Sequence, residues 1–202
     1  DLSFKKEDIE YLLQQIKQNI LNNRISIQNG KSHWMENRKS GIWIADHSLF
    51  DGRLGIALFL SIYAHYFCDS KAKEEGYNLY MECVQAYQNA LKSFGEGPIM
   101  PWSLMHGISG LLYVSAFYWN LGYQDASKKS IEDALGYLEK SPIPTKLDLY
   151  DGIAGTIVAL CRVNHIIDTS KLLRKLCQNL CHQLKLKQVH KNDDSWAHGL
   201  AG

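Results

Sequence analysis

Hydrophobic residues follow two alternating patterns along the chain. Runs that are apolar on all sides lie at 56–64, 111–119 and 157–161. Between them, apolar residues recur at three- and four-residue steps, as in Tyr77, Tyr80, Val84, Tyr87 and Leu91. A helix that is apolar all round is buried all round, whereas a helix with one apolar stripe covers a core from outside. The pattern therefore predicts helical hairpins, each with an inner and an outer helix.

The opening segment fits the same scheme. It contains one apolar stripe, which predicts a surface helix with a single buried side, and the stripe consists of Ile9, Leu12, Leu13, Ile16 and Ile20. Strand-like alternation is nearly confined to 41–44, which is too short to carry a sheet. The expected fold class is all-α.

A glycine motif repeats four times, at 49–55, 104–110, 149–155 and 196–202. Each copy contains Gly-x-x-Gly, and the second glycines are spaced by 55, 45 and 47 residues at Gly55, Gly110, Gly155 and Gly202. Such a period indicates a repeated hairpin. The hairpins could stack into an open solenoid or close into an α/α toroid, and inner helices buried on all sides favour the toroid. In a toroid every inner helix starts at one face, so the motifs should converge there.

The residue before each first glycine is ionisable: Asp51, His106, Asp151 and His198. Ionisable side chains gathered at one mouth are a plausible reaction centre. The alternative for Asp51 and Asp151 is a helix N-cap, and the alternative for His106 is a packed histidine at the rim.

Composition limits the function classes. The formal charge of the 202 residues is +1, without a basic run, which argues against a nucleic-acid partner. The longest uncharged stretch, 97–124, is interrupted by small polar residues, so we expect a buried helix and no transmembrane segment. The cysteines are scattered, at Cys68, Cys83, Cys161, Cys177 and Cys181, and no secretory signal precedes them. This pattern favours the cytoplasm, with membrane association only through partners.

The motifs around Asp51 and Asp151, and the segment 196–202, resemble the lanthionine synthetase C-like family, and most closely the cyclase domain of class II lanthipeptide synthetases. The resemblance covers the chain from about residue 42. It implies an α/α toroid of seven hairpins, of which residues 1–202 would be the N-terminal part, an incomplete ring of about three and a half repeats. It also implies a reaction, the addition of a peptide cysteine thiol to dehydroalanine or dehydrobutyrine, which gives the thioether ring of a lantibiotic.

By the same resemblance, Asp148 and His198 are the proton-transfer residues. His106 is a candidate for substrate binding because of its place among the ionisable residues of the motifs. Asp148 could instead be a helix-entry cap, and His106 stands where the family pattern predicts a small residue. The implied partner is a lanthipeptide precursor peptide, with a dehydratase domain or partner protein also expected.

The family's zinc ligands, two cysteines and a histidine, follow the Ala-His-Gly motif that contains His198. We therefore expect the Zn²⁺ ligands beyond residue 202 and no metal ligand within the chain. Cys181 precedes His182, but Gln183 replaces the glycine of the family motif. Cys177 and Cys181 could hold a metal at their i, i+4 spacing, although packing in the core or an interface is the favoured interpretation. A partial ring should expose apolar patches and be inactive alone.

Two other functions stay open. A carbohydrate-active α/α barrel would use Asp148 with a second carboxylate, and Trp102 and Trp119 as sugar platforms. A non-catalytic helical-repeat module would bind a peptide on its concave face, with the glycines serving helix packing only.

Overall fold

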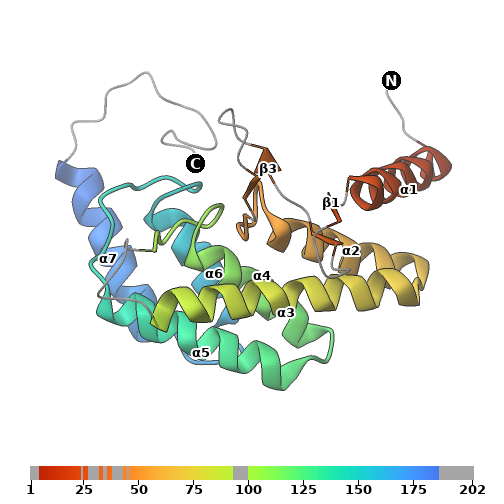
Figure 1. Cartoon of the computed structure of the whole chain (residues 1–202). Helices are drawn as coiled ribbons and strands as arrows, with labels where there is room; N and C mark the ends of the chain where they lie inside the picture. Colours follow the sequence, from red (N-terminus) through yellow and green to blue (C-terminus); the bar gives the residue numbers. More distant parts are fainter. Residues whose placement is uncertain are drawn as a thin grey trace.

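The computed structural model describes residues 5–23, 25–26, 32–33, 36–37, 43–44, 46–92 and 100–186. This part of the chain contains seven helices (Figure 1), α1 (Lys6–Asn22), α2 (Arg53–Phe67), α3 (Ser70–Lys92), α4 (Ile108–Asn120), α5 (Gln124–Lys140), α6 (Ile153–Val163) and α7 (Ser170–Leu186). Four two-residue strands form two antiparallel pairs between α1 and α2, β1 (Ile25–Ser26) with β2 (Ser32–His33) and β3 (Glu36–Asn37) with β4 (Trp43–Ile44). The predicted all-α class is confirmed, and β4 coincides with the short alternating segment.

Helices α2 to α7 form three consecutive hairpins. In each, a shorter helix is followed by a longer one that packs against it, giving the pairs α2–α3, α4–α5 and α6–α7. Helix α4 contacts both α2 and α6, so the three shorter helices make an inner layer, and α3 contacts α5 in the outer layer (Figure 1). The all-round apolar character of α4 follows from this position, because its side chains face neighbours on several sides. Those with at most 2% exposure include Leu111, Leu112, Val114 and Tyr118.

Tyrosines tie the first hairpin to the second. The rings of Tyr80 and Tyr118 stack with centroids 3.9 Å apart, and both side chains are fully buried. The Tyr118 hydroxyl donates to the carbonyl oxygen of Gly76 at 2.8 Å and lies 2.7 Å from Ser61 Oγ. Burial raises the pKa of Tyr118, so it stays protonated and can donate. A hydroxyl buried here needs these partners, since an unpaired one would cost about 1–3 kcal/mol.

Helix α1 is held to the hairpins by polar contacts and by the partly buried Leu13, which packs against a cluster that includes Tyr63. Lys17 pairs with Asp69 and lies over the ring of Tyr63, 4.9 Å from its centroid. The predicted helix is present, but its apolar stripe is largely uncovered within the described structure, since Ile9 and Leu12 are about half exposed. Helix α1 contains no buried residue.

Large apolar side chains are also exposed on the first and last of the three inner helices. Ile62 of α2 is 50% exposed and Val158 of α6 is 41% exposed. The middle inner helix, α4, has a neighbour on each side and exposes no comparable side chain in the described part of the chain. The exposure therefore follows from position, because α2 and α6 lie at the two ends of the described row of inner helices. Among the described residues, no helix is both long enough and apolar enough to cross a membrane.

Candidate functional site at the glycine turns

The three described glycine motifs form the same tight turn before α2, α4 and α6. The first glycine of each is the helix N-cap, and the next residue's N–H bonds back to the carbonyl six positions before that glycine, as from Ile153 to Lys146 at 3.0 Å. The second glycine lies against the backbone of the same turn. A Cβ built on Gly155 would lie 2.2 Å from the Leu149 carbonyl oxygen, so only glycine fits.

Hydrogen bonds join these turns to one another. The N–H groups of Leu49 and Phe50 donate to the Met105 carbonyl at 3.0 and 3.1 Å, and the Met105 N–H donates to the Tyr150 carbonyl at 3.3 Å. The Leu104 side chain of the second turn also lies close against Gly155 of the third motif, because a Cβ built on Gly155 would lie 2.8 Å from the Leu104 Cβ. The predicted convergence of the motifs is confirmed for these three. The fourth motif, with His198, lies outside the described residues.

The alternative in which Asp51 and Asp151 are helix N-caps is wrong. The N-cap residues are Gly52 and Gly152 themselves, with extended backbone and no side-chain cap bond. Asp51 is exposed, and Asp151 instead pairs with Lys146 at 2.9 Å. Partial burial of Asp151 opposes its ionisation, but hydrogen bonds from Lys146 and Ser103, aided by nearby positive charge, lower its pKa. Neither carboxylate is therefore used to cap a helix, and both lie at the face where the three turns meet.

Asp148 is part of the third turn. Its Oδ1 accepts a hydrogen bond from the Asp151 N–H at 2.7 Å, so it stabilises the turn and not the helix end. Its counterparts, also four residues before the first glycine, are Ser48 and Ser103. The Ser103 hydroxyl accepts from the His106 N–H at 2.9 Å in the same way. Asp148 is only partly buried, which leaves its carboxylate accessible to solvent.

His106 lies in a group of aromatic rings contributed by all three turns. Its ring centroid is 5.1 Å from that of Tyr150 and 6.1 Å from that of Phe50, and Phe50 and Tyr150 are 5.2 Å apart, all in edge-to-face orientation. We call Phe50, His106 and Tyr150 the ring cluster. Sequence reasoning named His106 but missed the other two. The signal was available, since both precede the first glycine of their motif by two residues.

A cavity of about 470 Å³ opens beside the ring cluster, between the start of α4 and the loop from α5 to α6. His106, Lys146 and Asp151 contribute polar groups to it, and its apolar lining includes Pro101, Pro142, Ile143 and Pro144. Asp148 is not among the described residues that line the cavity.

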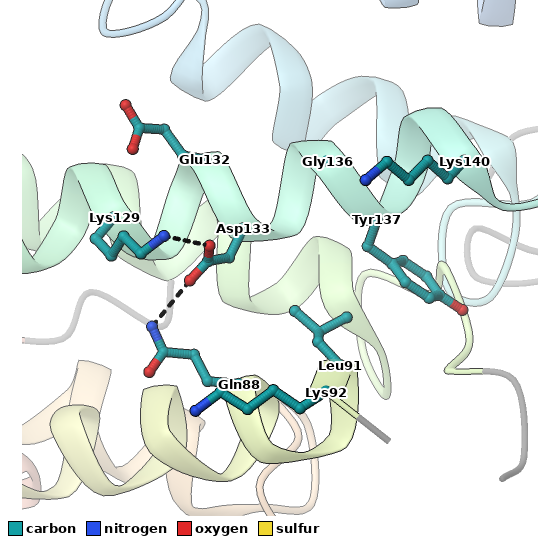
Figure 2. Close-up of a pocket in the computed structure, with 9 residues that line it drawn as sticks. All are labelled: Gln88, Leu91, Lys92, Lys129, Glu132, Asp133, Gly136, Tyr137 and Lys140. Carbon is teal, nitrogen blue, oxygen red and sulfur yellow. Dashed lines mark hydrogen bonds and ion pairs between the residues drawn. The ribbon is translucent and has the colours of Figure 1, made fainter. Parts of the chain in front are cut away.

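A second cavity, of about 460 Å³, lies in the outer layer between α3 and α5 (Figure 2). Asp133 of α5 joins its walls by accepting from Gln88 Nε2 of α3 at 2.9 Å, and it also accepts from Lys129 Nζ within α5 at 2.7 Å. These contacts are those of a packed interface between two outer helices, and we assign no chemistry to this cavity.

The described cysteines do not fit a zinc site. Burial raises the pKa of Cys83 to about 12, so it is a thiol and a poor ligand. Cys177 and Cys181 are exposed on α7, so packing in the core is wrong for both, and packing in an interface stays a prediction. In the described ranges, no three His, Cys, Asp or Glu side chains are grouped closely enough to hold a metal ion.

Trp102 does not serve as a sugar platform. It is 4% exposed, and its Nε1 donates to Ser141 Oγ at 2.9 Å. An indole with both faces packed cannot stack on a ligand, which removes one of the two tryptophans that the carbohydrate alternative needs.

Comparison with known proteins gives one family. The family model described as lanthionine synthetase C-like protein matches residues 44–202, which include all three turns and the segment with His198. A search of curated proteins finds no match.

Proposed function

The chain belongs to the lanthionine synthetase C-like family, and on this premise we propose that it forms part of a lanthipeptide cyclase. The family implies an all-α toroid, to which the three hairpins contribute consecutive segments, and binding of a peptide substrate in general. The finer proposal is that a cysteine thiol of the peptide adds to a dehydrated residue and closes a thioether ring. In that reaction, zinc would hold the thiol as a thiolate, and its ligands would come from outside the described residues.

We assign Asp148 and His198 to proton transfer and His106 to substrate binding. Addition of the thiolate to the double bond produces an enolate, which must receive a proton at carbon. A partly exposed carboxyl at a shared face can carry that proton between solvent and substrate. The same proposal includes a dehydratase domain or partner that supplies the dehydrated peptide.

The observation that carries the assignment of Asp148 is the comparison of equivalent turns. Ser103 supports the second turn with an uncharged hydroxyl that accepts backbone N–H bonds. The turn therefore does not need a negative charge at this position, yet the third turn has a carboxylate there. Because local structure does not require the ionisable group, a chemical role accounts for it better.

Asp148→Asn in the protein as its gene encodes it tests this assignment. The amide oxygen can still accept the hydrogen bond from the Asp151 N–H, so the turn should persist while the ionisable group is lost. We expect cyclisation of a dehydrated precursor peptide, followed by thiol alkylation and mass spectrometry, to fall at least about 100-fold. Binding of the peptide should change little.

Asp125→Asn is the matched control, because Asp125 is an exposed carboxylate in the first turn of α5. It should leave cyclisation unchanged. Full activity of Asp148→Asn would refute the assignment, and peptide binding by a protein that never cyclises the peptide under any condition would favour the non-catalytic module.

A further inference from the structure

The ring cluster presents aromatic surface to solvent at the face where the turns meet. Phe50 is 60% exposed, although it contacts His106 and Tyr150 edge-on. Phe50 and Tyr150 are held by their backbones as well as by ring contacts, since the Phe50 N–H and the Tyr150 carbonyl both bond to Met105. The rings therefore stand on a fixed base, and their exposure is a property of the fold.

Negative charge surrounds these rings. Asp51 and Asp151 flank the cluster, and their charges, after burial, raise the pKa of Tyr150. Asp148 lies in the same turn as Asp151. Two cations belong to the described turns: Lys146 pairs with Asp151, and Arg53 is buried and pairs with Glu82 of α3. The ring faces thus lie in a negative potential, a combination that attracts a cation.

We propose that the ring cluster, with Asp51, is a subsite for a lysine or arginine side chain of the peptide substrate. The cation lies against the exposed ring of Phe50 and is attracted by the Asp51 carboxylate. His106 belongs both to the ring cluster and to the wall of the 470 Å³ cavity. A peptide anchored at the rings thereby extends toward the cavity beside the turn that contains Asp148. This inference rests on the proposed function, because it names the substrate feature that the same face recognises.

The test uses two synthetic probes, acetyl-Gly-Ser-Lys-Ser-Gly-amide and the same peptide with norleucine in place of lysine. Binding to the full chain is followed by NMR through the labelled methyl group of Met105, the turn residue to which the Phe50 N–H bonds. We expect the lysine probe to bind about two- to fivefold more tightly, the range for a cation against exposed rings. Added salt should reduce this preference.

Variants then localise the preference. Phe50→Ala should abolish it, and Phe50→Leu should abolish it as well, because leucine keeps apolar bulk without a π-face. Asp51→Asn should weaken it. The side chain of Phe50 is 60% exposed, so its removal should leave the core intact. Tyr11→Ala is the control, because Tyr11 is an aromatic residue of α1 that is 65% exposed and away from the turns.

Equal binding of the two probes, tighter binding of norleucine, or a preference that survives in Phe50→Ala would overturn the subsite. The measurement involves no turnover, so its failure is distinguishable from loss of cyclisation in Asp148→Asn. Where cyclisation is established, Phe50→Ala should raise KM for a lysine-containing precursor and leave kcat unchanged.

Discussion

Replacement of Gly155 with alanine should destabilise the protein through two contacts that an added methyl group cannot avoid. The Cβ would lie 2.2 Å from the Leu149 carbonyl oxygen and 2.8 Å from the Leu104 Cβ. The oxygen belongs to the turn that starts the same helix, and Leu104 belongs to the preceding turn. Relief of the first contact requires the third turn itself to distort. Relief of the second requires the second and third turns to move apart, which would also stretch the bond from the Met105 N–H to the Tyr150 carbonyl.

The magnitude follows from two opposing effects. Overpacking at a rigid site costs about 3 kcal/mol at the upper end of the usual range. Alanine in place of glycine inside a helix returns about 1 kcal/mol. We expect a net loss of about 2 kcal/mol in the free energy of unfolding, which for a chain of this size lowers Tm by roughly 4–8 °C.

Gly136→Ala provides the matched control within α5. A Cβ at Gly136 meets no atom within 4 Å, so this variant should gain about 0.5–1 kcal/mol. Urea unfolding followed by far-UV circular dichroism measures both, with an unchanged m-value as the sign that the unfolded states are comparable. If Gly155→Ala is as stable as the unsubstituted protein, close approach of the turns is not the reason for this glycine.

Two further predictions concern ionisation. The hydrogen bond from Lys17, aided by the Ala72 N–H, lowers the pKa of Asp69 below 3.8 in the folded protein. The ionised Asp69 therefore stabilises the folded protein at pH values above its unfolded pKa, and this stabilisation is lost as the pH falls through its folded pKa. Protection of the α1 amides against hydrogen exchange, corrected for the intrinsic exchange rate at each pH, should therefore fall on acidification below about pH 4, and Asp69→Asn should show low protection already at pH 7. Burial raises the pKa of Cys83 to about 12, so a thiol reagent at pH 8 should reach Cys83 only after denaturation. The same reagent should modify the four exposed cysteines at once, namely Cys68, Cys161, Cys177 and Cys181. Rapid modification of five thiols in the native protein would contradict the buried position of Cys83.

The fold was largely predictable because its determinants are local and repeated. All-round apolar runs gave α2, α4 and α6, and glycine spacing gave the position of each turn. The helix caps were not predictable from the same rules. An aspartate before a helix usually caps it, but here Gly52 and Gly152 occupy the N-cap positions and the aspartates fall one residue outside.

The site was less predictable because its contacts join residues distant in the sequence. The role of Lys146 depends on the fold of the turn, which returns Asp151 to within 2.9 Å of its amine. The exposure of Cys177 and Cys181 depends on which side of α7 meets α6, a choice that an amphipathic pattern of leucines and cysteines leaves ambiguous. The function of His198 stays a prediction, since no contact of that residue is described.

The ring cluster bears on the shape of the whole layer of inner helices. Packed helices lie 8–10 Å apart, so in a straight row the first and third turns would be separated by about 16–20 Å. Phe50 of the first turn and Tyr150 of the third nevertheless have ring centroids 5.2 Å apart, with the second turn bonded to both. Two aromatic side chains directed toward each other cover much of that distance, and a curved row, as the all-α toroid of the family implies, accounts for what remains.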